Sequence, residues 1–387
     1  MRFTLTDAYL YLICLFPVMT TLTGGGIGNK VLFLLLLFLH LVLFFSRPVK
    51  RRTLTVLILL AGNYAFMLAF TDFPLRNYNL LAYYPFFLMY TCFSGDNGKM
   101  LLRWLSRHRE FVLLVIVGWC GITGISMFLP GCYQIREGGK LYFGSFCKDI
   151  FRLGPSAVFV QILILLRMTL HEKKTSIVFM AVPMACYLMG SSRTYLVVGF
   201  FLLVIGWYLI CGNRKLFWGT ILPLSMAVLL LVCMSALGNK IAYTLDEGQY
   251  GDFWYRITSS RSYLWEQYLR AWWKTPLLNK LFGNHLEFTL AVAERWAHND
   301  FLELLCSFGV LGVIQYCAVL RRLFATCWNG KSVPRLMRIC TVMVWLFNAL
   351  FNMHYVYFCA MLGYPLLVLA LGEYYGRAKE CAVPVQH

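Results

Sequence analysis

The segment NKVLFLLLLFLHLVLFFS, residues 29–46, places one lysine and no acidic residue in a long apolar run. A helix needs about 20 mainly apolar residues to cross ~30 Å of hydrocarbon. Similar runs recur along the chain, in which 60% of residues are hydrophobic. Because lipid offers no hydrogen-bond partners, only helices and closed barrels span it, and these runs are too long for barrel strands. The expected fold class is an all-α, polytopic integral membrane protein.

We predict about twelve transmembrane helices in one transmembrane domain, residues 1–387. They lie at residues 7–23, 29–46, 53–71, 78–94, 110–130, 150–170, 175–190, 194–211, 215–237, 298–320, 336–352 and 354–372. Most lysines and arginines fall in one alternating set of connecting segments, at 47–52, 96–109, 171–174, 212–215, 321–338 and 377–379. The positive-inside rule makes these segments cytoplasmic, so both termini lie inside. The long loop at 238–297 is then extracytoplasmic (periplasmic).

The chain carries a net charge of +18, which in other proteins accompanies nucleic-acid binding. No zinc-finger, RNA-binding or long basic-tail pattern accompanies this charge, so we expect no nucleic-acid partner. The 14 cysteines are mostly single within apolar runs and form no CxxC pair. A Walker loop, a GxSxG elbow, an HExxH motif and a paired Asp-x-Asp are also absent from the sequence, so we expect no metal and no cofactor. Cys132 and Cys147 share one predicted outer loop, where either a disulfide or two free thiols is compatible with the sequence.

Arg193 follows Gly190, Ser191 and Ser192 and begins a predicted span at the outer membrane surface. An arginine there can simply extend to the lipid headgroups. The small, polar residues before it also leave room for a ligand, and the planar guanidinium binds phosphate oxygens in a bidentate manner. Arg193 is therefore a candidate phosphate ligand.

The long loop is too rich in tryptophan and tyrosine to be disordered, and it contains a helix-compatible stretch at 253–274. The simplest reading is an amphipathic helix whose aromatic residues lie at headgroup depth. Such a helix would also place arginines where a lipid pyrophosphate enters from the bilayer. The candidates there are Arg256, Arg261 and Arg270, and Trp265 has a ring face suited to stacking on sugars.

His298 lies at the outer end of the predicted span 298–320. Asn299 or Asp300 could merely cap that helix. The positive end of the helix dipole favours neutral imidazole, which is the form that accepts a proton, so the position also suits a general base. His285 and Arg295 are close enough in sequence to line the same cavity.

Four short motifs occur in order on the predicted outer side: SSRTYL at 191–196, SRSYLWEQYLRAWWKTP at 260–276, LFGN at 281–284 and AHNDFLELLCSFGVLG at 297–312. In this combination the chain resembles the O-antigen polymerase and O-antigen ligase superfamily of bacterial envelope glycosyltransferases. The motifs cover about a quarter of the chain. The first six predicted spans match the superfamily only in hydropathy.

The resemblance implies a metal-independent, inverting glycosyl transfer from a glycan carried on undecaprenyl pyrophosphate. Carried over, Arg193 and Arg261 would hold the pyrophosphate and His298 would take the proton of the acceptor hydroxyl. Other expected substrate-binding residues are Arg256, Arg270, Arg295, Asn299, His285 and Trp265.

The resemblance leaves the acceptor open. A polymerase would join two lipid-linked repeats into O-antigen, capsule or exopolysaccharide, whereas a ligase would transfer the glycan to lipid A-core; we expect the polymerase. The expected partners are the glycan donor and acceptor, membrane lipids and, as a candidate, a chain-length regulator. The expected location is the cytoplasmic (inner) membrane, with the active site on its extracytoplasmic face. A lipid-linked sugar flippase or another twelve-span transporter is the alternative from a different class, although the two halves of the chain show no convincing similarity.

Overall fold

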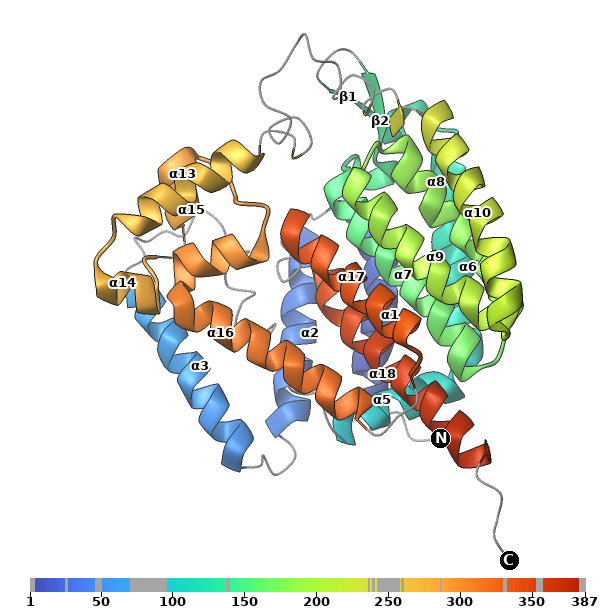
Figure 1. Ribbon diagram of the computed structural model, residues 1–387, viewed down its shortest axis with the longest axis horizontal. Coiled ribbons are helices and arrows are strands. Elements are labelled where there is room, and N and C mark those ends of the chain that lie inside the picture. The colour runs from blue at the N-terminus through green and yellow to red at the C-terminus, as the bar shows by residue number, and fades with distance from the viewer. Residues whose placement is uncertain are drawn as a thin grey trace, which may run out of the picture.

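The computed structural model describes residues 4–24, 27–45, 51–69, 96–136, 140–235, 237–238, 241, 258, 261–285, 287–329, 333–352 and 358–382. Most of these residues are helical, and the helices gather into a bundle (Figure 1). The longer helices are α1 (Leu5–Thr23), α2 (Ile27–Phe45), α3 (Arg51–Ala69), α5 (Asp96–Arg107), α6 (Arg109–Ser126), α7 (Ile150–Leu170), α8 (Ala181–Met189), α9 (Arg193–Cys211), α10 (Arg214–Met234), α13 (Arg261–Trp273), α16 (Asp300–Trp328), α17 (Arg335–Phe351) and α18 (Phe358–Ala382). The short helices are the 3-10 turns η2 (Pro130–Cys132), η4 (Ser145–Cys147) and η5 (Lys174–Met180), followed by α14 (Leu277–Phe282) and α15 (Phe288–Ala293).

Among the described residues, six helices are long and apolar enough to cross a membrane: α1, α6, α7, α9, α10 and α16. The chain is therefore a mostly helical membrane protein. Helices α2, α3, α17 and α18 also coincide with predicted spans, whereas the predicted span 78–94 lies outside the described residues. The predicted span 175–190 is divided between η5 and the short helix α8. The total of twelve spans and the inside location of both termini stay predictions.

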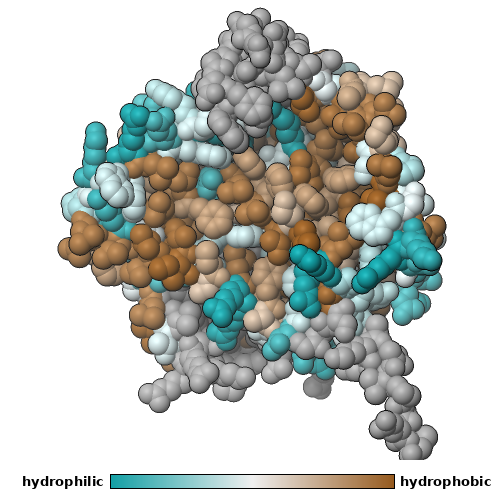
Figure 2. Space-filling view, viewed as in Figure 1, coloured by the Kyte–Doolittle hydropathy of each residue, from teal (hydrophilic) through white to brown (hydrophobic). Residues whose placement is uncertain are grey.

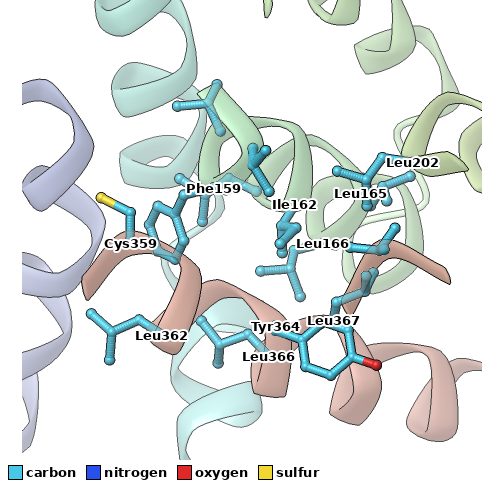
Figure 3. Packing of buried hydrophobic residues seen from close by; sticks show 14 of the residues in the cluster. Phe159, Ile162, Leu165, Leu166, Leu202, Cys359, Leu362, Tyr364, Leu366 and Leu367 are labelled. Carbon is cyan, nitrogen blue, oxygen red and sulfur yellow. The ribbon is translucent and has the colours of Figure 1, made fainter. Parts of the chain in front are cut away.

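Helix α7 forms the centre of the bundle. It is buried along nearly its whole length, because α1, α6, α9 and α18 all contact it. Figure 3 shows Phe159 and Ile162 of α7 packed against Leu362 and Leu366 of α18. Gly363 permits this approach, since a Cβ there would lie 2.6 Å from the Phe159 ring.

Polar contacts between helix ends define one end of the bundle. Arg167, near the end of α7, donates through Nη1 to the carbonyl of Arg109 at the start of α6 (2.9 Å) and through Nε to Ser176 (3.1 Å). His171 bonds the carbonyl of Leu105 in α5 through Nε2 (2.9 Å). The start of α7 therefore lies at the opposite end, together with the start of α9.

The predicted outer loop at 131–149 contains a two-stranded hairpin, which an all-α prediction does not include. Strands β1 (Tyr133–Arg136) and β2 (Lys140–Phe143) pair antiparallel, with Tyr133 opposite Phe143. Cys132 and Cys147, which flank the hairpin, are both buried free thiols. Burial raises the pKa of Cys147 to about 11, so this thiol is poorly reactive.

Helix α16 is broken at Gly309. Gly309 has φ 67° and ψ −171°, a conformation that essentially only glycine adopts. Figure 1 shows the chain changing direction within α16, beside α14. The predicted span at 298–320 therefore falls in a candidate membrane helix that is broken at Gly309, and its short first part folds back over the second.

Candidate functional site

Arg261 is the first residue of α13 and contacts the end of another helix. Its Nη1 donates a 2.6 Å hydrogen bond to the carbonyl oxygen of Phe351, the last residue of α17. The last carbonyls of a helix have no donor within the helix, and the dipole favours a cation there. This bond anchors the start of the predicted amphipathic helix on the bundle.

His298 lies in a tight turn just before α16. Its φ is 49°, in the left-handed region that non-glycine residues rarely adopt. Its ring centroid lies 6.2 Å from that of Phe151, with the two planes inclined by 26°. Since Phe151 belongs to the first turn of α7, the histidine lies over the central helix of the bundle.

The backbone N–H and C=O of Ala297, the residue before His298, are both hydrogen-bonded. The backbone N–H of Ala297 donates to Oε2 of Glu303 (3.2 Å), and the Trp265 Nε1–H donates to the carbonyl of Ala297 (2.8 Å). Ala297 is fully buried. The contacts from α13 and α16 therefore position the backbone of the histidine.

Glu303 is fully buried in the first turn of α16. Besides the Ala297 N–H, its carboxylate accepts hydrogen bonds from the Thr289 hydroxyl (2.8 and 3.0 Å) and the Ser307 hydroxyl (3.5 Å). A buried carboxyl group is tolerated only when it is hydrogen-bonded, and these three donors meet that need. Glu303 thus links α15, α16 and the turn that contains His298.

The electrostatic environment keeps His298 neutral. Burial, and secondly the nearby Arg261 guanidinium, lower the pKa of His298 from 6.5 to about 4. The imidazole is therefore uncharged at neutral pH and can accept a proton. The dipole of α16 is the cause expected from the sequence, whereas burial and Arg261 are the causes found here.

Arg193 is the first residue of α9 and lies at the same end of the bundle. The turn before it packs against the start of α7, where a Cβ on Gly190 would lie 2.5 Å from the Ile150 side chain. The next residue of α7, Phe151, contacts His298. The first turn of α7 therefore lies between Arg193 and His298 and contacts the segments that carry both.

Three more of the expected substrate-binding residues have structural roles at this end. The side chain of Asn299 caps α16 by accepting from the N–H of Leu302 (3.1 Å). The carbonyl of Arg295 accepts from the Tyr268 hydroxyl (2.8 Å), while the arginine itself is exposed. The Trp265 ring lies 6.1 Å from that of Phe351, beside the Arg261 anchor.

The remaining expected residues are less closely tied to His298. Arg270 is exposed and forms a salt bridge with Glu266, one turn earlier on α13. The His285 ring meets the ring of Phe288 edge-on at 5.5 Å, in the connection between α14 and α15. Arg256 lies outside the described residues.

Glu303 and Phe351 belong to this site but were not expected from the sequence. Glu303 could have been found from the sequence, because it lies inside the apolar run FLELLCSFGVLG. An ionisable side chain in such a run costs free energy, so its presence indicates a specific role. Phe351 contributes only a backbone carbonyl, for which its side chain gives no signal. Within the described part of the chain, no group of three His, Cys, Asp or Glu residues is arranged to hold a metal ion.

No protein-family model matches the chain, and a search of curated proteins finds no similar sequence.

Proposed function

We propose that this protein is an integral membrane glycosyltransferase of the O-antigen polymerase and ligase type. It would transfer a glycan from undecaprenyl pyrophosphate to the hydroxyl group of a second glycan. The observation that carries the proposal is the pairing of a neutral His298 with the Arg261 guanidinium at one end of an apolar helix bundle. The reaction needs a base to take the proton of the acceptor hydroxyl and a cation to stabilise the leaving pyrophosphate.

In the proposed reaction, an imidazole nitrogen of His298 takes the proton of the acceptor hydroxyl. The hydroxyl oxygen attacks C1 of the donor sugar, and the C1–O bond to pyrophosphate breaks with inversion at C1. The pyrophosphate leaves with the bonding electron pair, and Arg261 and Arg193 stabilise the negative charge that develops. By analogy with oxyanion-hole donors, removing one such group costs roughly 10²–10³ in rate.

The fold supports this assignment in a second way. Because α16 is broken at Gly309, its first part is a short helix whose N-terminus begins at the His298 turn. In membrane proteins such half-helix N-termini favour anionic groups of a substrate. The α16 dipole therefore adds to the guanidinium charge at the place proposed for the pyrophosphate.

Donor binding would also activate the base. The Arg261 cation contributes to the low pKa of His298. A bound pyrophosphate would offset that cation and raise the pKa of His298 toward neutrality. The imidazole would then be a stronger base in the donor complex than in the resting protein.

We propose polymerisation of lipid-linked repeats in the cytoplasmic membrane, with the site on the extracytoplasmic face. The test is to analyse surface polysaccharide from cells that lack the gene and carry the wild type, His298→Ala, Arg261→Ala or Arg193→Ala. Arg377→Ala is the matched control, because Arg377 is an exposed arginine near the end of α18. Membrane levels of every variant are measured in parallel.

Single lipid-linked repeats in the three site variants, with long chains in the wild type and in Arg377→Ala, would support the polymerase. Long chains that accumulate on the lipid carrier would point to the ligase instead. Normal polymer from all three well-expressed site variants would refute the proposed site and favour the transporter alternative.

A further inference from the structure

The short helix α14 presents an apolar surface to its surroundings although it belongs to a segment predicted to be an extracytoplasmic loop. Leu277 and Leu278 are 71% and 65% exposed, and Trp273, just before the helix, is 70% exposed. Leu281, one turn later, is also exposed. Figure 2 shows apolar surface where α14 lies, at the left of the view, below the hydrophilic surface over α13.

Helix α14 is rigidly attached to the broken helix α16. A Cβ on Gly283 would lie 2.1 Å from the carbonyl oxygen of Ser307, and one on Gly309 would lie 2.4 Å from the carbonyl oxygen of Leu281. Asn284 donates from Nδ2 to the carbonyl of Cys306 (2.8 Å), which adjoins the break. The exposed leucines therefore cannot turn inward without separating α14 from the point where α16 bends.

Helix α14 contacts α3, another helix with exposed apolar side chains. The rings of Phe282 and Phe66 lie 5.4 Å apart. Helix α3 exposes Leu54, Ile58 and Leu59 in turn. Exposed apolar side chains of this kind in a membrane protein are covered either by lipid chains or by another protein.

The charges beside α14 favour lipid. Lys274 precedes the exposed leucines and Lys280 lies among them in the sequence, and the Lys280 ammonium lies 4.8 Å from the centre of the Trp273 ring. Exposed tryptophan with neighbouring lysine is typical of segments at the boundary between acyl chains and anionic headgroups. Helix α13 carries an exposed salt bridge between Glu266 and Arg270.

We propose that α14 is a re-entrant segment embedded in the lipid leaflet that adjoins the His298 turn. Its exposed leucines would contact phospholipid acyl chains, and Lys274 and Lys280 would contact the phosphates of the headgroups. The segment anchors the break in α16 to the membrane. It thereby determines how deep the His298 turn lies relative to the lipid. The inference does not depend on the proposed glycosyl transfer.

The test uses the purified full-length protein in vesicles of phosphatidylethanolamine and phosphatidylglycerol that contain a phosphatidylcholine with a diazirine in its acyl chain. After illumination, mass spectrometry locates the lipid adducts. We expect adducts on 277–281, as on Leu229–Leu231 of α10, which are exposed in a candidate span. Adducts on α10 but none on 277–281 would overturn the proposal.

Two cysteine variants give an independent test. Leu278→Cys and Glu266→Cys are treated in the same vesicles with a membrane-impermeant maleimide, and the labelling of the parent protein is subtracted. We expect Leu278→Cys to react at least about tenfold more slowly than Glu266→Cys, since an apolar environment raises the thiol pKa and each unit removes about nine-tenths of the reactive thiolate. Equal rates would show that water reaches Leu278 and would refute embedding. Slow labelling of Leu278→Cys without lipid adducts would show that a second copy of the chain covers α14, which also refutes the lipid assignment.

Discussion

The Tyr316 hydroxyl donates a hydrogen bond to the carboxylate of Asp300, although sixteen residues separate the two within one helical segment. In a straight helix these residues would be about 24 Å apart, far beyond the reach of their side chains. The break at Gly309 brings them together, and Trp345 of α17 extends the contact by donating from Nε1 to the Tyr316 oxygen (3.1 Å). The folded-back start of α16 is thus held by a polar connection to its own second half.

Removing this connection should destabilise the bundle. Tyr316→Phe leaves the buried Asp300 carboxylate and the Trp345 N–H each without one hydrogen bond, which costs about 1–3 kcal/mol per group left unsatisfied. We expect a clear fall in the melting temperature of the detergent-solubilised protein. Tyr263→Phe is the control because that side chain is 57% exposed, and its melting temperature should be unchanged. Equal melting temperatures for the two variants would contradict the structural role.

Gly309→Ala should prevent the correct packing of α14. The new Cβ would lie 2.4 Å from the carbonyl oxygen of Leu281, and an alanine rarely adopts φ 67°. We expect low yields of folded protein in size-exclusion chromatography after membrane extraction. Gly118→Ala is the matched control in α6, where a Cβ meets nothing within 4 Å, and it should be neutral or stabilising by up to about 1 kcal/mol. A Gly309→Ala protein as stable as Gly118→Ala would rule out a required break.

Changes at Glu303 should affect both the stability of the protein and the transfer rate. Glu303→Ala deprives the Ala297 N–H and the Thr289 hydroxyl of an acceptor, so both the melting temperature and the transfer rate should fall. Glu303→Gln keeps one acceptor oxygen, so its melting temperature and its transfer rate should both fall less than those of Glu303→Ala. The exposed Glu294 serves as control through Glu294→Gln. A Glu303→Ala protein with normal transfer would mean that this carboxylate does not position His298.

Burial, and secondly the charge on Arg261, should lower the pH at which His298 becomes protonated. The pKa of His298 is lowered to about 4, so the reactive neutral imidazole persists down to about pH 5 and is lost as the pH falls through 4. Arg261→Gln removes one cause of this lowering, so the midpoint should move to higher pH. The measurement is the pH dependence of His298 modification by diethyl pyrocarbonate, which attacks neutral imidazole, followed on the peptide that contains His298.

Arg270→Gln is the control for that measurement, since Arg270 is exposed and paired with Glu266. Its midpoint should equal that of the wild type. A midpoint that is the same in all three proteins would show that burial alone determines the pKa of His298. A pyrophosphate analogue added to the wild type should raise the midpoint, because its negative charge offsets Arg261.

Local sequence patterns predicted much of the secondary structure. The apolar runs at 150–170 and 194–211 coincide with α7 and α9 to within a residue at each end. Hydropathy sums over neighbouring residues, so it identifies a membrane helix wherever its neighbours happen to lie. The hairpin at β1 and β2 was missed because four-residue strands give almost no periodic signal.

The candidate site was predicted only in part. His298 and Arg261 were predicted from their chemistry, and the charge of Arg261 lowers the pKa of His298. Asn299 caps α16, which is one of the two roles that the sequence allowed for it. Arg270 was grouped with them because it lies close in sequence, yet its position on α13 directs it to Glu266. The carbonyl of Phe351, ninety residues from Arg261, could not be expected from any local pattern.

The sequence by itself determined the class of the protein: long apolar runs must become helices in a membrane, because no other local structure satisfies their backbone there. Only the tertiary structure decided that α16 breaks at Gly309 and that its start folds back over Tyr316. A hydropathy window has the same mean whether its helix is straight or bent. The bend depends on a close backbone contact with α14 and on hydrogen bonds between distant residues, which exist only once the chain is packed.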